Sequence, residues 1–283
     1  MTVKKAVIPV AGMGTRFLPA TKSVPKEMLP IVNIPTIHYI VEEAVKSGIE
    51  EILFITSPHK KAIEDYFDRT LELEHALERS GKLDQLNMLK DISNLCKFTY
   101  IRQGEAKGTA HAINLARNFI GNEPFAVMYG DDLIKSDTPV LKQLIDLHDK
   151  TGANIIGVRK VKHEDTYKYG IIDYEDLNTK KIRSIVEKPK VEEAPSDYAG
   201  LGRYIVNPEI FDEIEILQPG HGSEYQFTDA MAALLKKQDF YACEFDGIYF
   251  DIGNHLGYIK ANIDYALDRE DLKEDLKEYI KSL

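Results

Sequence analysis

The sequence predicts an α/β protein built on a mostly parallel sheet. Through the first 150 residues, short stretches rich in Val and Ile alternate with segments of helical periodicity. Such alternation is typical of crossover units, in which each strand lies parallel to the one before it. Later in the chain the strands follow one another with fewer helices between them. This change indicates a second region laid on the same sheet.

The expected elements can be placed by their periodicity. Strands are expected at residues 6–10, 51–56, 98–103, 125–129, 155–161, 169–174, 182–187, 200–206, 240–244 and 248–251. Helices are expected at residues 36–47, 59–67, 109–119, 140–150, 226–237 and 256–268. The first helix has one apolar face, made by Ile37, Ile40, Val41, Ala44 and Val45, and Gly48 follows as a stop signal. Ligands of such sheets bind beyond the carboxyl ends of the strands, so the site residues should lie just after strands.

Two further segments are rich in charge. Residues 71–92 are expected to form an acidic helical pair on the surface, broken near residue 80. Residues 268–283 alternate in charge and predict an amphipathic helix that packs on the body or on a partner subunit. Its apolar side carries Leu272, Leu276, Tyr279 and Ile280.

Composition and charge narrow the class of protein. The 283 residues carry 36 Lys and Arg against 46 Asp and Glu, a net charge of −10, and 43% are hydrophobic. The acidic balance argues against a general nucleic-acid or anionic-membrane surface. The sequence has no apolar run of about 18 residues that would predict a membrane span. With no signal peptide and only Cys96 and Cys243 as cysteines, a reducing, cytoplasmic location is expected.

A glycine-rich turn, Ala11-Gly12-Met13-Gly14-Thr15-Arg16, follows the first strand. Gly12 and Gly14 would let backbone N–H groups approach an anion closely, and Arg16 adds a fork suited to phosphate oxygens. Alone, a Gly-x-Gly turn is a weak signal and could be a tight structural turn.

The residues that follow the turn separate it from two familiar phosphate motifs. Phe17 occupies the third small position of the dinucleotide fingerprint, and the sequence contains no Walker loop. The chain continues instead through a proline-rich stretch that carries Lys22 and Lys26. Two lysines and an arginine around a glycine turn at a strand's carboxyl end predict a polyphosphate site.

The segment AGMGTRFLPATKSVPKEMLPI, residues 11–31, resembles the signature of the sugar-phosphate nucleotidyltransferases. Within that superfamily it is most similar to the bacterial UTP–glucose-1-phosphate uridylyltransferases, and the resemblance extends through most of the chain. It implies a Rossmann-like, three-layer α/β/α nucleotidyltransferase fold with a mixed, mostly parallel central sheet and a C-terminal helical segment. Residues 1–254 would be the catalytic domain, with a nucleotide part of about 1–135 and a sugar part of about 136–254. Residues 255–283 would be C-terminal helices at a possible oligomer interface.

The resemblance also implies an activity. UTP and α-D-glucose 1-phosphate would give UDP-glucose and pyrophosphate, with Mg²⁺ as cofactor and a homo-oligomer, a dimer or tetramer, as the working form. No nucleic-acid or membrane partner is expected. Three alternatives stay open: transfer of a uridylyl or thymidylyl group to another hexose 1-phosphate, a non-catalytic sugar-nucleotide binding protein, and a dinucleotide-dependent oxidoreductase. Phe17 and the lack of a ribose-binding acidic residue at the expected spacing argue against the last.

Site residues on the nucleotide side follow from the same resemblance. Gln103, after the strand at 98–103, can both donate and accept, as a pyrimidine edge requires. Gly108 precedes a helix whose first N–H groups are available as donors. The implied nucleotide-binding set is Ala11, Gly12, Gly14, Thr15, Glu27, Gln103 and Gly108, and the implied catalytic residues are Arg16, Lys26 and Lys188. His111 is expected to be a packed or capping histidine.

Carboxylates mark the metal and sugar positions. Asp131 and Asp132 follow the strand at 125–129, where adjacent carboxylates are costly without a cation, although an N-cap would be the ordinary alternative. Mg²⁺ usually takes one or two carboxylates with phosphate oxygens and water. The family pattern implies Asp131 and Asp251 as the metal ligands, with Asp132 ranked lower. Its sugar-binding positions are Gly170, Glu187 and Gly202, with Glu224 as a weaker contact.

Overall fold

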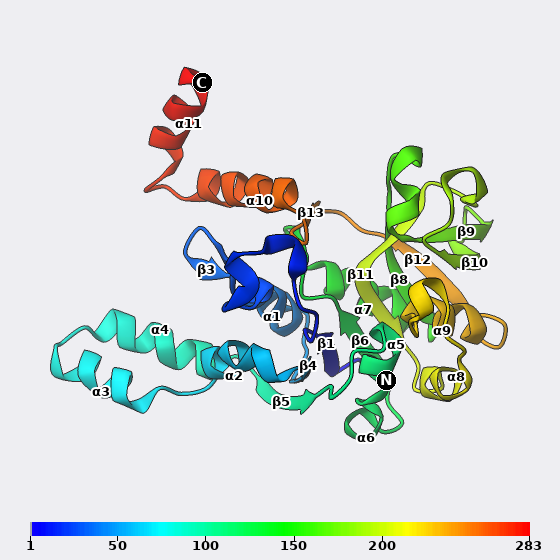
Figure 1. The fold of residues 1–283 in the computed structure, drawn as a ribbon, viewed down its shortest axis with the longest axis horizontal. Coiled ribbons are helices and arrows are strands. Elements are labelled where there is room, and N and C mark those ends of the chain that lie inside the picture. The colour runs from blue at the N-terminus through cyan, green and yellow to red at the C-terminus, as the bar shows by residue number, and fades with distance from the viewer. Residues whose placement is uncertain (1) are drawn as a thin grey trace.

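The computed structural model describes residues 2–283, so residue 1 of the expected catalytic domain lies outside the described residues. Its main sheet has nine strands in the order β5-β4-β1-β6-β11-β8-β12-β10-β9 (Figure 1). The strands are β1 (Lys5–Pro9), β4 (Glu51–Thr56), β5 (Lys97–Arg102), β6 (Phe125–Met128), β8 (Asn154–Lys160), β9 (Gly170–Asp176), β10 (Lys181–Glu187), β11 (Tyr198–Val206) and β12 (Phe240–Glu244). Two small sheets pair β2 (Pro30–Ile31) with β3 (Ile34–Pro35) and β7 (Asp132–Lys135) with β13 (Ile248–Asp251).

Strands β5, β4, β1 and β6 are parallel, and successive side chains go to opposite faces of the sheet. On one face, Ile8 and Phe54 pack into a core with helices α1 (Thr36–Lys46) and α7 (Val140–Thr151). On the other face, Val7 packs into a second core with α5 (Thr109–Asn114), α8 (Ile210–Ile216) and α9 (Phe227–Leu234). Because both faces of β1, β4 and β6 are covered, these three strands are largely buried, whereas β5, at the edge of the sheet, has no buried residue. The predicted three-layer arrangement is confirmed.

The later strands form a different structure. β11 runs antiparallel to β6 and carries the sheet into the second half of the chain. There, β8, β12, β10, β9 and β11 each pair with two others of the set and close into a ring. The ring is bound to the first region through β6 and β11. The second region is therefore laid on the same sheet, as expected, but it curls where the first region stays open.

Six further α-helices complete the described chain. They are α2 (Lys61–Phe67), α3 (Leu71–Arg79), α4 (Leu83–Ser93), α6 (Arg117–Ile120), α10 (His255–Asp268) and α11 (Lys273–Ser282). The expected helical pair forms as α3 and α4 and projects from the body (Figure 1). The helix expected at 109–119 is instead divided into α5 and α6, because Leu115 and Ala116 bond to residues three positions back, in a tighter turn.

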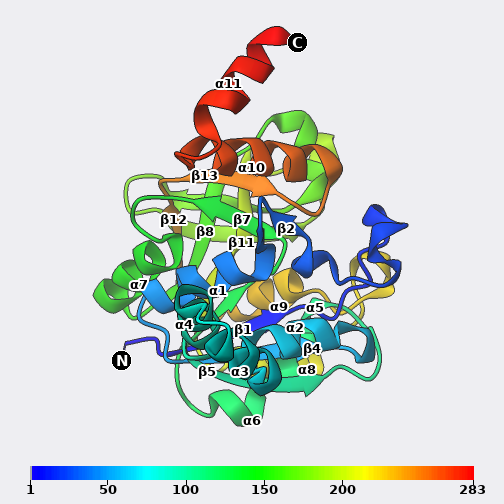
Figure 2. The same cartoon turned by 90° about the vertical axis from the view of Figure 1, so that its left-hand side faces the viewer.

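The C-terminal helix differs from expectation in its packing. α11 forms, but it has no buried residue and extends away from the body beyond α10 (Figure 2). Tyr279 and Leu283 are both exposed. The prediction that α11 packs on the body is therefore wrong, and its packing on a partner subunit stays a prediction. Within residues 2–283, no helix combines the length and the apolar character needed to cross a membrane.

Candidate active site

Three adjoining pockets form one groove along the carboxyl ends of the parallel strands and into the ring. A pocket of about 780 Å³ shares Ala11, Gly12 and Gln103 with a pocket of about 360 Å³. The second pocket shares Tyr129 and Asp131 with a third of about 240 Å³. All predicted site residues except Gly14 and Thr15 line this groove. We refer to its three parts as the base end, the middle and the sugar end, after the ligands that the sequence predicts for their residues.

The glycine-rich turn is held by local contacts. Gly14 has φ of 65°, and the hydroxyl of Thr21 donates to its carbonyl oxygen at 2.8 Å. A Cβ atom on Gly14 would lie 3.1 Å from Cβ of Lys26, so the absence of a side chain lets the two segments pack. Thr15 is exposed and begins a short 3-10 turn that ends at Phe17. These two residues support the loop from outside the groove wall.

Lys26 crosses the middle of the groove to an acidic partner. Its Nζ atom lies 2.5 Å from Oδ2 of Asp131. Burial alone would lower the pKa of Lys26, but the negative charges of Asp131 and Glu27 outweigh it and leave that pKa raised. Burial would likewise raise the pKa of Asp131, but Lys26 outweighs burial and lowers it. Both groups are therefore charged at neutral pH.

The two predicted metal ligands converge on one glycine. A Cβ atom on Gly253 would lie 3.0 Å from Oδ1 of Asp251 and 3.1 Å from Oδ2 of Asp131. The same position is 3.6 Å from Nη1 of Arg16. Residues 2–283 hold no group of three or more His, Cys, Asp or Glu side chains placed for a metal. Oδ2 of Asp131 is the atom that pairs with Nζ of Lys26, and Oδ1 of Asp251 accepts from the backbone N–H of Gly253. Two neighbouring carboxylates are nevertheless the ligand type that suits Mg²⁺, which takes its remaining ligands from phosphate and water.

Asp132 lies next to this pair but points elsewhere. The Tyr249 hydroxyl donates to Oδ1 of Asp132 at 2.5 Å, and a Cβ on Gly202 would overlap its other oxygen. Burial and the neighbouring charge of Asp131 raise the pKa of Asp132 to about 7. Gly202 has φ of 58°, so its missing side chain serves both the backbone and this contact.

Glu27 has a partner that the sequence did not reveal. Lys60, just before α2, donates to its carboxylate at 2.6 Å, and both side chains are almost completely buried. This pair ties the loop that carries Lys26 to the segment after β4. The carboxylate of Glu27 is thus engaged by Lys60, and its expected contact with a nucleotide stays a prediction. A second buried pair missed from the sequence joins Arg203 to Glu43, with distances of 2.7 and 3.0 Å.

The sugar end gathers the residues predicted from the Glu-Lys-Pro segment. Glu187 ends β10, and Lys188 follows it with φ of 42°. Nζ of Lys188 lies 3.3 Å from Oε1 of Glu187. A Cβ atom on Gly170 would lie 3.1 Å from Thr228, so this glycine leaves room at the wall. Arg16 and Asp251 line the same end of the groove.

The base end is built around Gln103 and Gly108. Gly108 has φ of 109°, and a Cβ on it would lie 2.5 Å from the carbonyl oxygen of Tyr225, so no larger residue fits. Gln103 is almost buried, and its Nε2 atom lies 3.0 Å from Nδ1 of His111. The helix after Gly108 is only six residues long, shorter than the sequence predicted.

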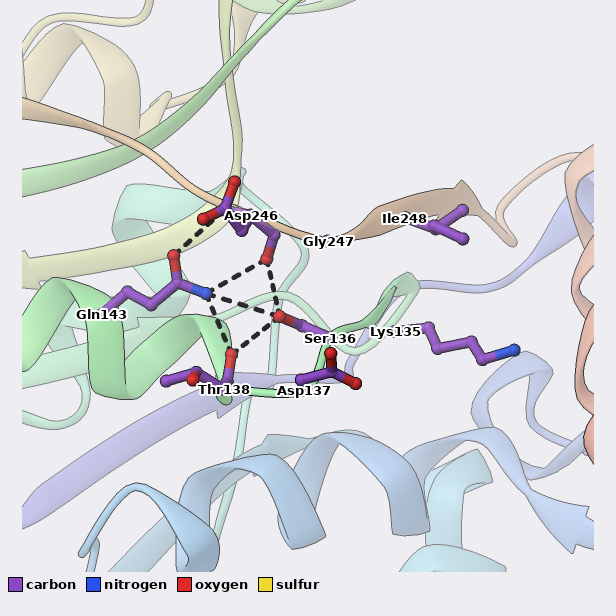
Figure 3. A pocket seen from close by; sticks show the side chains of 8 residues that line it. All are labelled: Lys135, Ser136, Asp137, Thr138, Gln143, Asp246, Gly247 and Ile248. Atoms are coloured by element: carbon purple, nitrogen blue, oxygen red, sulfur yellow. Dashed lines mark hydrogen bonds between the residues drawn. The ribbon is translucent and has the colours of Figure 1, made fainter.

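A separate hollow of about 920 Å³ lies between the β7–β13 pair and the start of α7 (Figure 3). Its polar groups bond to one another. Ser136 donates to the carbonyl oxygens of Thr138 and Asp246, and Gln143 bridges to Asp246 through both ends of its amide. These contacts hold the segment before β13 against the start of α7, so we interpret the polar groups of this hollow as structural.

The fold and the groove are those of a nucleotidyltransferase, and comparison with known proteins shows the same class of enzyme. The chain belongs to the nucleotidyl transferase family, whose model matches residues 5–267. It is 52% identical over 283 residues to a UTP–glucose-1-phosphate uridylyltransferase of Staphylococcus epidermidis, covering 99% of this chain and 98% of that protein. UTP–glucose-1-phosphate uridylyltransferase 1 of Staphylococcus saprophyticus is 50% identical over 285 residues, covering 100% of this chain and 99% of that protein.

Solved structures give the same answer. A UDP-glucose pyrophosphorylase complexed with UDP-glucose is similar with a TM-score of 0.85 and 42% identity, covering 94% of this chain and 100% of that one. A UTP-bound enzyme from Acinetobacter baumannii is similar with a TM-score of 0.87 and 38% identity, covering 99% of both chains.

Proposed function

We infer that this chain transfers the uridylyl group of UTP to α-D-glucose 1-phosphate and releases pyrophosphate. Its support is the similarity over the whole chain to proteins named for this reaction and to structures that hold UTP or UDP-glucose. The observation that carries the inference is the continuous groove. It runs from Gln103 at the base end, past Lys26 and Asp131, to Glu187 and Lys188 at the sugar end. That order matches the order of base, phosphates and sugar in the product.

The reaction needs positioning and charge neutralisation more than proton transfer. An oxygen of the sugar phosphate attacks the α-phosphorus of UTP, and the bond from that phosphorus to the β-phosphate oxygen breaks. The attacking oxygen is already ionised near neutral pH, so no general base is required. We assign Arg16 to the β- and γ-phosphates, Lys26 to the α-phosphate, and Lys188 to the incoming sugar phosphate. Such electrostatic stabilisation is the main source of rate in phosphoryl-type transfer.

We further propose that Asp131 and Asp251 hold Mg²⁺. When bound, the cation would neutralise phosphate charge between the two anionic substrates. The convergence of the two carboxylates on Gly253 supports this assignment. Asp251→Asn should raise the Mg²⁺ concentration needed for half-maximal activity by roughly tenfold or more, because even outer-shell changes cost a metal site 10–100-fold. A Mg²⁺ titration identical to that of the wild type would refute the assignment.

One assay tests the function directly. Pyrophosphate release should be measured across a matrix of nucleoside triphosphates and sugar 1-phosphates, with and without Mg²⁺. Greatest turnover with UTP and glucose 1-phosphate is expected. A preference for TTP or for another hexose 1-phosphate would favour the alternative transferase, and binding without turnover would favour a sugar-nucleotide binding protein.

We also propose a division of labour and an assembly. The nucleotide is assigned to about residues 1–135 and the sugar to about residues 136–254. The exposed apolar side chains of α10 and α11, which include Leu256, Ile259 and Tyr279, support a homo-oligomer. Light scattering coupled to size exclusion tests this, and a monomer at micromolar concentration would contradict it. Two free cysteines suit a reducing compartment, which supports a cytoplasmic location.

A further inference from the structure

His111 does not line the groove itself and reaches it only through the side chain of Gln103. It belongs to α5, where Thr109 and Ala112 line the groove, whereas His111 meets Gln103, with Nδ1 3.0 Å from Nε2. Within residues 2–283, the only side-chain hydrogen bond of either residue is this one. His111 is therefore placed to act on Gln103.

Both partners are fixed in position. The backbone N–H of Gln103 donates to the carbonyl oxygen of Thr56 at 2.8 Å, and its side chain is only 7% exposed. Ala110, which precedes His111, is buried and donates to the carbonyl oxygen of Tyr225 at 2.9 Å. The contact thus joins two anchored segments, the end of β5 and helix α5.

A glutamine amide needs such a partner in order to discriminate between bases. Its oxygen and its nitrogen are similar in shape, but one accepts hydrogen bonds and the other donates them. A uracil edge presents an N–H donor beside a carbonyl, and a cytosine edge presents an acceptor nitrogen beside an amino group. An amide that can turn over can pair with either edge. An amide whose nitrogen is held by His111 keeps its oxygen and its second N–H for the base.

We propose that His111 is a positioning residue for base selection: its Nδ1 accepts from Nε2 of Gln103 and fixes the amide in the orientation that pairs with uracil and disfavours cytosine. In this arrangement the ring proton of His111 is on Nε2. The proposal rests on the proposed function, because it takes UTP as the substrate and Gln103 as the residue that meets the base. It assigns His111 no contact with the substrate itself.

The test uses a pair of variants that are both branched at Cγ. His111→Asp keeps an acceptor oxygen near the position of Nδ1 and, when ionised, has no donor, and His111→Leu removes the acceptor. His111→Phe is a second variant without an acceptor that keeps a ring. His38→Phe is the matched control, because His38 also bonds through Nδ1, to the hydroxyl of Tyr66 at 3.2 Å in the core region around α1. For each variant, kcat and KM are measured with UTP, CTP and glucose 1-phosphate, together with the midpoint of urea unfolding.

The Leu and Phe variants should lower the ratio of kcat/KM for UTP over CTP by roughly tenfold, the size expected for one hydrogen bond lost in recognition. KM for glucose 1-phosphate should stay within about twofold. His111→Asp should retain most of the ratio, and His38→Phe should leave it unchanged. In a Gln103→Ala background, His111→Leu should have no further effect on the ratio.

Three results would overturn the proposal: an unchanged ratio in both variants that lack the acceptor, an equal loss in the Asp and Leu variants, or a full effect of His111→Leu without Gln103. If wild type itself fails to use UTP, the proposed function fails instead, and that outcome is seen before any variant is made.

Discussion

The two ends of the groove hold their charges in different ways. Along the base end and the middle, which we call the nucleotide side after the ligand predicted there, Glu27 and Lys60 form an ion pair in which neither side chain is more than 4% exposed. On the sugar side, Glu187 and Lys188 lie 3.3 Å apart, and the lysine side chain is 38% exposed. The first pair is covered by the loop that carries Lys26 and by the segment after β4. The second stands at the open end of β10, where Pro189 prevents the strand from continuing.

This difference teaches which charges the fold depends on. A buried ion pair has lost its water, so removing one partner leaves an uncompensated charge in the interior. In the second pair the Glu187 side chain is only 11% exposed, but Lys188 reaches solvent, so water can replace its contact at lower cost. Changes on the nucleotide side should therefore affect stability and activity together. Changes on the sugar side should affect activity alone.

The largest expected effect is at Lys60. Lys60→Met should lower the free energy of unfolding by about 3–5 kcal/mol, because it strands the buried carboxylate of Glu27. Urea denaturation measures this. The double variant Glu27→Gln/Lys60→Met should recover most of the loss. Lys61→Met is the control, since Lys61 is exposed and 3.9 Å from Asp65, and it should change stability by less than about 0.5 kcal/mol. Equal effects at the two lysines would contradict the claim that the fold depends on the buried Glu27–Lys60 pair.

Lys26 should show the mixed behaviour of the nucleotide side most clearly in turnover. Lys26→Ala should lower kcat by roughly 10²–10³-fold, the usual cost of one group that stabilises transition-state charge. It should also reduce stability modestly, because Asp131 loses its partner at 2.5 Å. Steady-state kinetics at saturating UTP, with circular dichroism as the test of folding, measure both effects. Near-normal turnover in a folded variant would exclude Lys26 from the mechanism.

The sequence predicted the open sheet better than its surroundings. β1, β4 and β6 could be placed because each is a short apolar run covered on both faces, and β5, although at the edge, because its Phe, Thr, Tyr and Ile favour a strand. By contrast, α8 was missed: its apolar residues Ile210, Phe211 and Ile214 have helical spacing but fill less than two turns, which is too short to establish a period. β7 was missed because its four residues are strand only through pairing with β13, more than 110 positions later.

The site shows the same limit. Arg16, Lys26, Asp131 and Asp251 belong to motifs whose residues follow strands, so they could be named in advance. Lys60 could not, because its importance comes from Glu27, 33 positions earlier in the chain. Arg203 could not either, since its partner Glu43 is 160 positions away. A sequence pattern carries the local part of a site, and buried pairs between distant segments appear only in the folded chain.

A smaller effect is expected at the sugar end. Glu187→Gln should raise KM for glucose 1-phosphate by roughly tenfold, as expected when a hydrogen bond to a charged group is weakened. KM for UTP should change by less than twofold, and the urea midpoint should hardly move, since the partner Lys188 is accessible to water. Steady-state titration of each substrate against a saturating concentration of the other measures this. Equal rises in both KM values would argue against sugar recognition by Glu187.

The smallest effect concerns the two thiols, one beside each region. Burial raises the pKa of Cys96, before β5, to about 12, and that of Cys243, in β12, to about 11. The thiolate is the reactive form, and its fraction falls as the pKa rises above the ambient pH. At pH 8, alkylation by iodoacetamide should be at least about 100-fold slower than for a free cysteine of pKa near 8.5. The rate should increase about tenfold for each unit of pH up to 10. Mass spectrometry of the intact protein follows the reaction, and the Cys96→Ser and Cys243→Ser variants assign it. Because neither thiol lines the groove, activity should survive labelling. Labelling of either thiol in the native enzyme within minutes at pH 8 would contradict the burial of that thiol.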